Sequence, residues 1–586
     1  MAENQPGREP IQIVEIQQPL CENVFGVSPC TATGTGDTKC YNTRATCQDT
    51  ENFALGDPLS LFFSRGRGYE CALNCTPYVI PSLVSVSTSP TKINLAGANP
   101  DAQGLGNRAL CTLVFQDHQH TDRVVDPYVD ERSWDPLSPE RGSFWTRWLV
   151  RNKYRQNIVI NVYEGYVGQT LAQMLKRQYF MTSASGPDSR GRVVVKGKDI
   201  LARIEERKAQ APVGSFGELF TEIDDAQTSF EVAGALVDEY DASGTLRIGD
   251  EIMTYTSVAT STNGITFSGV TRGTDNSQAE EHDEESTVQQ CLRYEDTSVD
   301  DLLFDLLTTY GGIPASFLDT TNWAEEIGDY LSAYRLTGLV TDPVSVFQLV
   351  SEVQLQTLCY LWWDERDSLV KLKAIRGVDE EPPTLTEEAN IIAGTFSTTE
   401  KPRERVSRVY VHYLMRDFTQ SYDDPEAYTS RYGFVNLEAE SPELYGEKAV
   451  RNVYARFLRT QALAANTATK IITRYVEVPT EATFEMDAKD RSYWVGDTFR
   501  IRHHLDRNEF GELRERQWTV VSAEEFVPGE KVRYVVADTT LYGRIFFVMA
   551  ADAADYPGYD NAPFKNCYIG NAEGLLSDGQ QAGRIS

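Results

Sequence analysis

The cysteines of this chain are concentrated near its N-terminus, in a stretch that has little else to fold around. Seven of the ten cysteines lie in the first 111 residues, and four of them follow the pattern C-x8-C-x9-C-x6-C: Cys21, Cys30, Cys40 and Cys47. The residues between them are rich in Gly, Thr and Asn, a composition typical of irregular loop. We therefore expect that something other than a hydrophobic core holds this segment together.

Four clustered thiols suit several kinds of centre. Soft thiolate ligands match iron–sulfur clusters, and a [4Fe–4S] cubane has four irons to bind. Structural zinc also takes four thiolates, but usually from close C-x2–4-C pairs, which this segment lacks. Two disulfides are a further alternative if the protein meets air after release. The clustering favours a cluster or metal ion over plain buried thiols, and such a centre can act purely as a structural staple.

The three other N-terminal cysteines are weaker ligand candidates. Cys71 and Cys75 are separated by three residues, and Cys111 stands alone in a predicted strand region. Each offers an alternative ligand, but we interpret all three as small buried hydrophobic residues of a β core.

The chain is acidic, which limits its partners. It has 55 Lys and Arg against 86 Asp and Glu, so its net charge is 55 − 86 = −31. Such a chain is a poor candidate for binding nucleic acid, which needs a basic surface. An acidic channel would instead let DNA pass without holding it. The alternative is that the charge only keeps a large surface soluble.

Nothing in the sequence indicates a leader or a membrane-spanning helix. The N-terminus has no basic region followed by an apolar stretch. The longest wholly apolar run is residues 545–551, seven residues against the ~20 that a spanning helix needs. We expect synthesis in a reducing cytoplasm, where thiols are more often ligands than disulfides.

With 586 residues, the chain is too long for one hydrophobic core. Strand patterns, turn signals and helical periodicity predict a multidomain, mainly β protein with an α+β unit. We divide it as follows: residues 1–50, Cys-rich segment; 51–215, first β domain; 216–292, a small inserted β-barrel; 293–380, α+β domain; 381–550, second β domain; 551–586, C-terminal tail.

Several individual elements are predicted from local signals. A helix is expected after Ser298, stopping at Gly311, and a second is expected to start at Asp342-Pro343, an N-cap followed by proline. Residues 357–363 and 369–375 read as a hairpin. A long helical stretch is expected from Val450 to about Ile472.

Enzyme motifs are scarce. The chain has no G-x-x-x-x-G-K-[ST], G-x-S-x-G or H-E-x-x-H and only six histidines. We interpret the metal-like group Asp117, His118, His120 and Asp122 as a polar loop. His503 and His504 adjoin on a predicted strand and should point to opposite faces, so we do not expect them to share a metal. A metal- or iron–sulfur-dependent enzyme is therefore a weaker alternative.

A second alternative is a host-receptor or cell-wall carbohydrate-binding adhesin. The inserted module at residues 216–292 is the segment that would bind carbohydrate. We prefer to interpret it as a spacer or a contact module for neighbouring proteins.

Several segments resemble tail-tip (baseplate) hub proteins of siphophages and prophages of proteobacteria and of gene transfer agents. The N-terminal segment, residues 21–49 (CENVFGVSPCTATGTGDTKCYNTRATCQD), is the most specific. Others are residues 78–94, 115–126 (FQDHQHTDRVVD), 144–152 (FWTRWLVRN), 185–188 and 567–579 (CYIGNAEGLLSDG). Together they are spread over most of the chain outside the inserted module.

The resemblance implies a structural virion protein and not an enzyme. Such hubs are homotrimers whose two β domains resemble tail-tube barrels, with an α+β side domain, so that three chains present a pseudo-sixfold ring to a hexameric tail. The implied partners are the distal tail protein ring, the tape-measure protein and tip fibre or receptor-binding proteins, with phage DNA passing through unbound. By resemblance to lambda-type tail-tip proteins, Cys21, Cys30, Cys40 and Cys47 would bind a [4Fe–4S] cluster.

Overall fold

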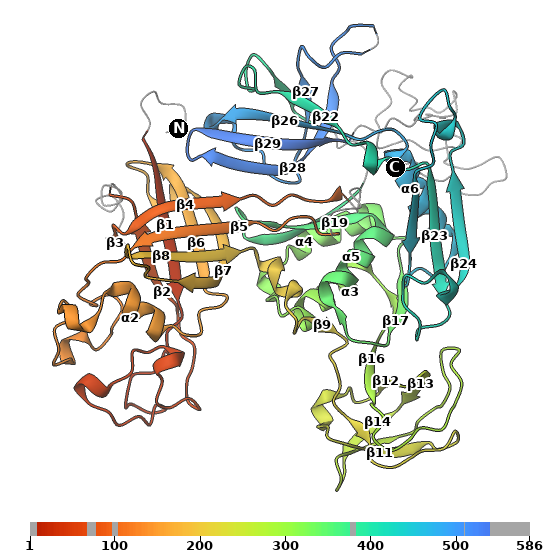
Figure 1. Cartoon of the computed structure of the whole chain (residues 1–586), viewed down its shortest axis with the longest axis horizontal. Coiled ribbons are helices and arrows are strands. Elements are labelled where there is room, and N and C mark those ends of the chain that lie inside the picture. Colours follow the sequence, from red (N-terminus) through yellow and green to blue (C-terminus); the bar gives the residue numbers. More distant parts are fainter. Residues whose placement is uncertain (1–8, 67–77, 96–103, 376–381, 509, 540–586) are drawn as a thin grey trace, which may run out of the picture.

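The computed structural model describes residues 9–66, 78–95, 104–375, 382–508 and 510–539. Cys71, Cys75, Cys567 and the predicted tail at 551–586 lie outside the described residues. The described chain is mainly β, with several sheets and a few helices, as the sequence predicts (Figure 1). Within these residues, no helix has the length and apolar character to cross a membrane.

The first sheet has eight strands in the order β3-β2-β1-β6-β7-β8-β5-β4. Its strand β1 lies between β2 and β6, although the sequence analysis placed its residues in the Cys-rich segment. Both faces of β1 carry buried apolar residues: Val14 and Ile16 belong to the core of the sheet, and Ile11 and Ile13 pack with Met174 in a smaller cluster. The bounds are β1 Pro10–Gln18, β2 Leu59–Ser64, β3 Val79–Ile80, β4 Leu83–Ser89, β5 Leu110–Gln116, β6 Val159–Tyr166, β7 Leu175–Ser185 and β8 Arg192–Lys198.

Helix α2 (Phe144–Arg151) packs on this sheet and was not expected from the sequence. Its buried residues Phe144, Trp145 and Trp148 share one core with Phe63 and Phe115 of the sheet. The Phe63 and Phe115 rings lie 5.4 and 4.7 Å from that of Trp145, measured between ring centroids. The two tryptophans therefore belong to the core of the first sheet.

The inserted module has its own core, formed by residues between Leu219 and Val288. One four-stranded sheet has the order β10-β11-β15-β14, and a second has the order β13-β12-β16-β17, so β16 connects the module to the α+β unit. The bounds are β10 Glu218–Leu219, β11 Ser229–Ala233, β12 Gly244–Ile248, β13 Glu251–Tyr255, β14 Ser257–Thr260, β15 Ile265–Ser268, β16 Gln289–Thr297 and β17 Leu336–Val340.

The polar segment after Arg272 in this module is held by one buried carboxylate. Glu251 accepts two hydrogen bonds from Arg272 at 2.7 Å, one from the Gly273 N–H at 2.9 Å, and contacts His282 Nε2 at 2.8 Å. Burial alone would raise the pKa of Glu251, but these bonds bring it down to about 2. An ion pair therefore fixes a loop that has few apolar residues.

The α+β unit confirms one predicted helix start and corrects another. Helix α3 (Val299–Asp305) begins after Ser298, whose hydroxyl accepts from the Asp301 N–H, and a π turn continues it to Tyr310. The second expected helix does not start at Asp342-Pro343. Instead α5 (Val346–Thr357) starts after the cap Ser345, because β18 (Val344–Ser345) pairs with β9 (Gln210–Ala211) and keeps that segment extended.

The remaining elements of this unit are a short helix and a hairpin. Helix α4 (Thr320–Glu326) contacts strand β20. The hairpin predicted at 357–375 is confirmed as β19 (Cys359–Asp364) and β20 (Leu369–Ala374). Strand β19 is buried along its whole length, including Trp362 and Trp363, whereas β20 alternates between half-buried and buried residues.

The C-terminal half contains two further sheets. A three-stranded sheet β24-β23-β25 packs against helix α6, and a six-stranded sheet has the order β21-β27-β28-β29-β26-β22. The bounds are β21 Thr384–Thr386, β22 Ser397–Glu400, β23 Arg408–Met415, β24 Tyr428–Val435, β25 Val450–Tyr454, α6 Gln461–Tyr475, β26 Thr480–Asp487, β27 Thr498–Arg502, β28 Arg516–Val527 and β29 Lys531–Asp538.

The long helix expected from Val450 is wrong in its first part. Residues 450–454 form β25, which pairs in parallel with β23 from Arg408↔Val450 to His412↔Tyr454. Helix α6 starts only at Gln461, after the cap Thr460. Pairing with a distant strand thus overrides the local helical pattern.

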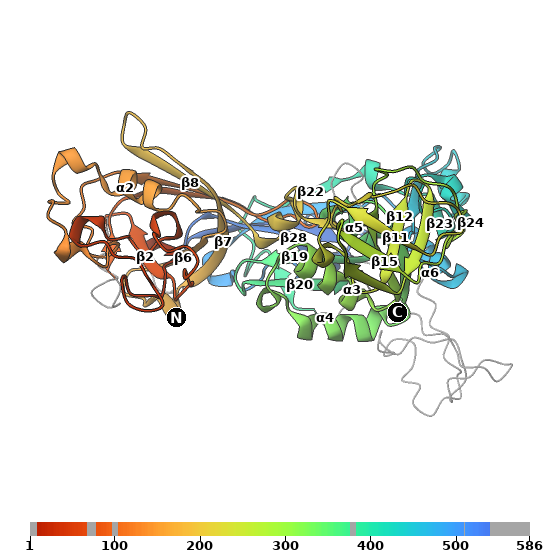
Figure 2. The same cartoon turned by 90° about the horizontal axis from the view of Figure 1, so that it is seen from below.

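The eight-stranded and six-stranded sheets are in direct contact (Figures 1 and 2). The Tyr166 hydroxyl donates to the Gly529 carbonyl at 2.7 Å, and the Ile93 N–H donates to the Val521 carbonyl at 3.0 Å. The α+β hairpin joins the same region, because Trp363 Nε1 donates to the Gln178 carbonyl on β7 at 3.1 Å. The N-terminal loop with the four cysteines lies at the far end of the eight-stranded sheet, beside α2 (Figure 1).

Candidate metal centre

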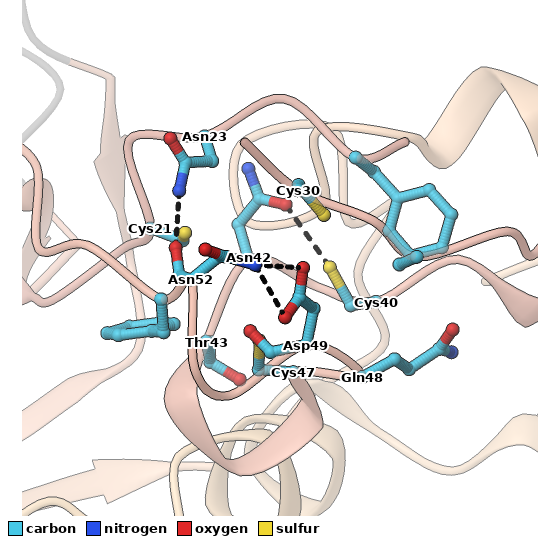
Figure 3. Close-up of a pocket in the computed structure, with 13 residues that line it drawn as sticks. Cys21, Asn23, Cys30, Cys40, Asn42, Thr43, Cys47, Gln48, Asp49 and Asn52 are labelled. Atoms are coloured by element: carbon cyan, nitrogen blue, oxygen red, sulfur yellow. Dashed lines mark hydrogen bonds between the residues drawn. The ribbon is translucent and has the colours of Figure 1, made fainter. Parts of the chain in front are cut away.

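The four predicted ligand cysteines line a single pocket. Cys21, Cys30, Cys40 and Cys47 come from separate parts of the loop that follows β1, and Figure 3 shows them around one space. The pocket is partly open, and its empty space, adjoining solvent included, is about 330 Å³. All four are free thiols; Cys40 is buried, and the other three are half-buried.

Short turns and backbone bonds place each cysteine at the pocket. Cys21 follows the end of β1, and its N–H donates to the Asn42 carbonyl at 2.7 Å. The Cys30 N–H donates to the Val27 carbonyl at 2.9 Å. Cys40 follows the 3₁₀ turn Gly36–Thr38, and Cys47 directly follows the 3₁₀ turn Arg44–Thr46. The loop is therefore ordered without a core of its own.

The buried Arg132 guanidinium fixes this loop to the first sheet domain. It donates to the backbone carbonyls of Gly36 and Lys39 at 2.9 Å and of Cys40 at 3.1 Å. Its remaining N–H groups hold the Asp126 carboxylate at 3.0 and 3.1 Å. Both side chains of this ion pair are fully buried. Arg132 therefore fixes the position of the backbone around Cys40.

A second set of contacts joins the loop to helix α2. The Thr43 hydroxyl donates to the Arg151 carbonyl at 2.6 Å, and the Arg151 guanidinium lies 3.9 Å from the centroid of the Tyr41 ring. Asp122 in turn accepts from Arg147 and Arg151, both at 2.8 Å. The position of the cysteine loop thus depends on the orientation of α2.

The thiols are close enough to influence one another. Burial raises the pKa of Cys40, and the nearby Cys47, Cys30 and Cys21 raise it further, while a hydrogen bond from the Asn42 backbone lowers it. Four neighbouring thiolates would repel one another unless a cationic centre sat between them. The donor set therefore fits a metal or cluster that binds thiolate.

The sulfur spacing distinguishes two kinds of centre. Four thiolates around one zinc ion lie about 3.8 Å apart, given a Zn–S bond of about 2.3 Å and tetrahedral geometry. Among the described residues, the only group of three or more possible ligands with all ligand atoms within 4.8 Å of one another is elsewhere in the chain, so the four sulfurs do not meet this condition. A cubane binds each thiolate to a different iron and so spaces the sulfurs more widely than a single zinc ion does.

Of the alternative ligands named from the sequence, Cys71 and Cys75 lie outside the described residues, and Cys111 is not part of this pocket. Cys111 lies on β5 in the core of the first sheet, where burial raises the pKa of its thiol to about 12. Cys291 and Cys359 are also buried in cores. In the sequence, these three cysteines differ from the four candidate ligands because they lie in strand segments and not in a loop rich in Gly, Thr and Asn.

The group at residues 117–122 is a structural loop, as the sequence analysis interpreted it. Asp117 accepts from the Trp145 N–H at 3.0 Å and from the Ser143 hydroxyl, which caps the start of α2. The His120 ring accepts from the Asp122 N–H at 2.9 Å. These side chains hold α2 and the backbone.

The expectation for His503 and His504 is wrong. Strand β27 ends at Arg502, so both histidines lie in the following turn, where both contact the Glu387 carboxylate. Their rings stack at 4.6 Å between centroids. The alternation that points neighbouring side chains to opposite faces applies only within a strand. Glu387, 116 positions away from His503 in sequence, carried no signal that could have linked it to them.

No family model matches the chain, and no curated protein matches its sequence. Among solved structures, it aligns with the 43 kDa tail protein of prophage MuSo2 from Shewanella oneidensis, with 8% identity and a TM-score of 0.34, over 78% of this chain and 97% of that one. It aligns with a tail protein from Neisseria meningitidis MC58, with 11% identity and a TM-score of 0.35, over 78% and 97%. A Francisella PdpA–VgrG complex aligns with 8% identity and a TM-score of 0.32, over 91% and 59%. At these scores the likeness establishes no function.

Replacing Arg132 with Ala should release the cysteine loop. The change leaves the buried Asp126 carboxylate unpaired, which costs about 3–5 kcal/mol. We expect the Cys40 thiol of the metal-free protein to react at least tenfold faster with a thiol reagent, measured by mass spectrometry of labelled peptides. The exposed Arg123 on the same loop provides the control, since Arg123→Ala should leave the labelling rate unchanged. Equal rates for both variants would contradict the role assigned to Arg132.

Helix α2 should lose its anchor in acid. Burial raises the pKa of Asp122, but bonds from His120 and Arg147 and the charge of Arg151 lower it from 3.8 to about 2. Its stabilisation, about 2 kcal/mol, is thus present above about pH 4 and is lost as the pH falls from about 4 to about 2. We expect hydrogen exchange of residues 144–151, corrected for intrinsic rates, to rise over this interval.

The matched variants test the cause of this acid response. Asp122→Asn should show weakened protection of α2 already at pH 7 and a flatter response below pH 4. Asp130→Asn, at an exposed position of the same region, should behave like the unaltered protein. An Asp122→Asn protein with the unaltered acid response would assign the effect to another carboxyl group.

Proposed function

We propose that this chain is a structural protein of a bacteriophage-type tail tip, a trimeric hub whose N-terminal loop is braced by a [4Fe–4S] cluster. Cys21, Cys30, Cys40 and Cys47 hold the cluster. The resemblance of the N-terminal segment to tail-tip hub proteins and the geometry of its four cysteines support this assignment.

The convergence of the four cysteines on one pocket is the observation that carries the proposal. They belong to the segment with the most specific resemblance, and they are 26 residues apart from first to last. A loop rich in Gly, Thr and Asn has no reason to gather four thiols unless they bind something in common. The four sulfurs do not all lie within 4.8 Å of one another, which supports a cubane rather than a single zinc ion.

The centre would stabilise the folded conformation of the N-terminal loop. When bound, a [4Fe–4S] cluster supplies four covalent links between loop segments, and electron transfer is not required of it. The protein contributes a fixed loop backbone: Arg132 and Arg151 lie 4.3 and 3.9 Å from the centroid of the Tyr41 ring, and each is paired with a buried carboxylate. Asp49, which also lines the pocket, is held by the Thr31 N–H at 2.6 Å and by Asn52.

The arrangement of two large sheets supports a trimeric hub. One chain joins an eight-stranded and a six-stranded sheet through direct hydrogen bonds. Three such chains around an axis would present six sheet units, which matches the pseudo-sixfold ring that the resemblance implies. The distal tail ring, the tape-measure protein and tip fibres are the partners of this proposal.

The charge of the chain suits passage of DNA without binding. A trimer carries 3 × 31 = 93 formal negative charges. Phosphate is repelled by such a surface, so DNA moving along the axis would find no site that holds it. The proposal places the protein at the tail tip of the virion, after synthesis in the host cytoplasm.

Iron and acid-labile sulfide content test the centre. The full chain, purified without oxygen, should contain about four irons and four sulfides and show broad absorption in the visible range. Cys21→Ser and Cys47→Ser should each lose most of the iron. Cys291→Ser, a buried thiol in a different core, should retain it.

The other outcomes are equally informative. One zinc per chain, lost in the same two variants, would replace the cluster with a single structural ion. A protein without metal, or one in which Cys291→Ser loses iron as well, would contradict the assigned ligand set.

Assembly state tests the hub. Light scattering of the purified chain should give a mass of about 197 kDa, three times 65.7 kDa. Electron microscopy should show a ring with a central opening. A monomer or dimer at all concentrations up to tens of micromolar would contradict the trimeric hub, whatever the metal content.

A further inference from the structure

Glu387, His503 and His504 form a compact group of possible metal ligands in the six-stranded sheet domain. One ligand atom from each lies within 4.8 Å of the other two, and no other group of three or more among the described residues meets this condition. His503 Nε2 is 3.4 Å from Glu387 Oε2, and His504 Nδ1 contacts the same oxygen directly.

The register of two parallel strands brings these residues together. Strands β21 and β27 pair with Thr386 opposite Arg502. The residue that follows each strand is a ligand candidate, Glu387 after β21 and His503 after β27, so both lie at the same end of the sheet. Parallel strands that end together place their following residues side by side, whatever their separation in sequence.

The surrounding backbone is fixed by its own hydrogen bonds. The Asn390 N–H donates to the Thr386 carbonyl at 3.0 Å, which closes the turn that contains Glu387. On the other side, the Asp506 N–H donates to the His503 carbonyl at 3.0 Å, and Arg507 Nε donates to the His504 carbonyl at 2.9 Å. The three side chains therefore face one another from two rigid turns.

One face of the group is apolar, and the other is open to water. The Phe396 ring stacks on His503 at 4.3 Å between centroids, and the His503 side chain is 5% exposed. The side chain of His504 is 58% exposed and that of Glu387 28%. A cation bound here would contact the buried His503 ring on its inner side. On its exposed side it would complete its coordination with water.

We propose that Glu387, His503 and His504 form a binding site for a divalent transition-metal ion of the zinc type. Two imidazole nitrogens and a carboxylate oxygen are a common three-ligand set for such an ion, with further positions left to water. Ligand atoms around tetrahedral zinc are about 3.4 Å apart, which follows from metal–ligand bonds of about 2.0–2.1 Å. His503 Nε2 and Glu387 Oε2 are 3.4 Å apart, at this spacing, while His504 Nδ1 lies nearer to the same oxygen and would move outward to bind the ion.

The metal replaces a proton in this arrangement. His503 Nδ1 accepts from the Leu505 N–H at 3.2 Å, so the proton of the neutral ring lies on Nε2, which faces Glu387. Binding the metal at Nε2 moves that proton to Nδ1 and gives up one long hydrogen bond. A metal–imidazole bond is stronger than the bond that is lost.

The local charge favours a cation. Asp506 is buried near His503; its Oδ1 binds Arg516 at 3.0 Å, while no hydrogen-bond partner is found for Oδ2 within the described part of the chain. Glu388 and Asp506 add negative charge around the His503 ring. The site lies in a different sheet domain from the four cysteines and does not depend on the function proposed above.

Cobalt(II) distinguishes this site from the cysteine pocket. Cobalt bound by thiolate absorbs strongly in the near ultraviolet, whereas cobalt bound by nitrogen and oxygen shows only weak visible bands. We expect the full-length protein, with its cysteine site loaded, to bind one further cobalt ion per chain without the thiolate absorption. Zinc should displace this cobalt.

Variants at the site decide the assignment. His504→Ala, at an exposed position, and Glu387→Gln should each weaken cobalt binding at least about tenfold and leave the absorption of the cysteine site unchanged. Glu388→Gln removes a neighbouring charge but no ligand, and should keep the cobalt stoichiometry. A protein that takes no further cobalt, or variants that bind it as tightly as the unaltered chain, would overturn the proposal and leave the three residues as a hydrogen-bonded group.

Discussion

The organisation of the N-terminal region depends on one buried ion pair, Arg132 with Asp126. The loop that carries the four cysteines has almost no apolar residues to bury, so hydrophobic packing cannot order it. Arg132 instead gives three of its N–H groups to backbone carbonyls of that loop and the others to Asp126. An arginine can do this because its planar group offers five donors in fixed directions. The pocket between the cysteines forms because Arg132, which lies outside the loop, fixes the loop's backbone.

Buried carboxylates paired with arginine also order two other segments that have few apolar residues. In the inserted module, Glu251 collects Arg272, His282 and backbone N–H groups and so orders a strongly polar segment. Beside the cysteine loop, Asp122 binds two arginines of α2. Each carboxylate is buried and fully paired, which is the condition under which a buried charge stabilises a fold. In this acidic protein, with a net charge of −31, some of the carboxylates therefore form buried ion pairs that hold loops in position.

Local sequence signals succeeded where the structure is locally determined. The cap at Ser298 and the hairpin at 357–375 followed from short patterns. The failures share one cause, which is pairing between distant segments. Val450 belongs to a strand because it pairs with β23. The helix expected at Asp342 starts later because Val344 pairs with β9 and is therefore extended. Glu387 and His503 meet through a strand register that no local pattern encodes.

The sequence by itself determined that the chain is mainly β, strongly acidic and divided into several units, and that four cysteines share a loop without a core. Composition and short-range periodicity decide these properties, because they depend on each residue and its near neighbours. Only the tertiary structure decided that the four thiols face one pocket, that Arg132 and α2 hold the loop, and that Glu387 joins two histidines. Those contacts link residues that are tens to more than a hundred positions apart, and their geometry is fixed only when the sheets are assembled.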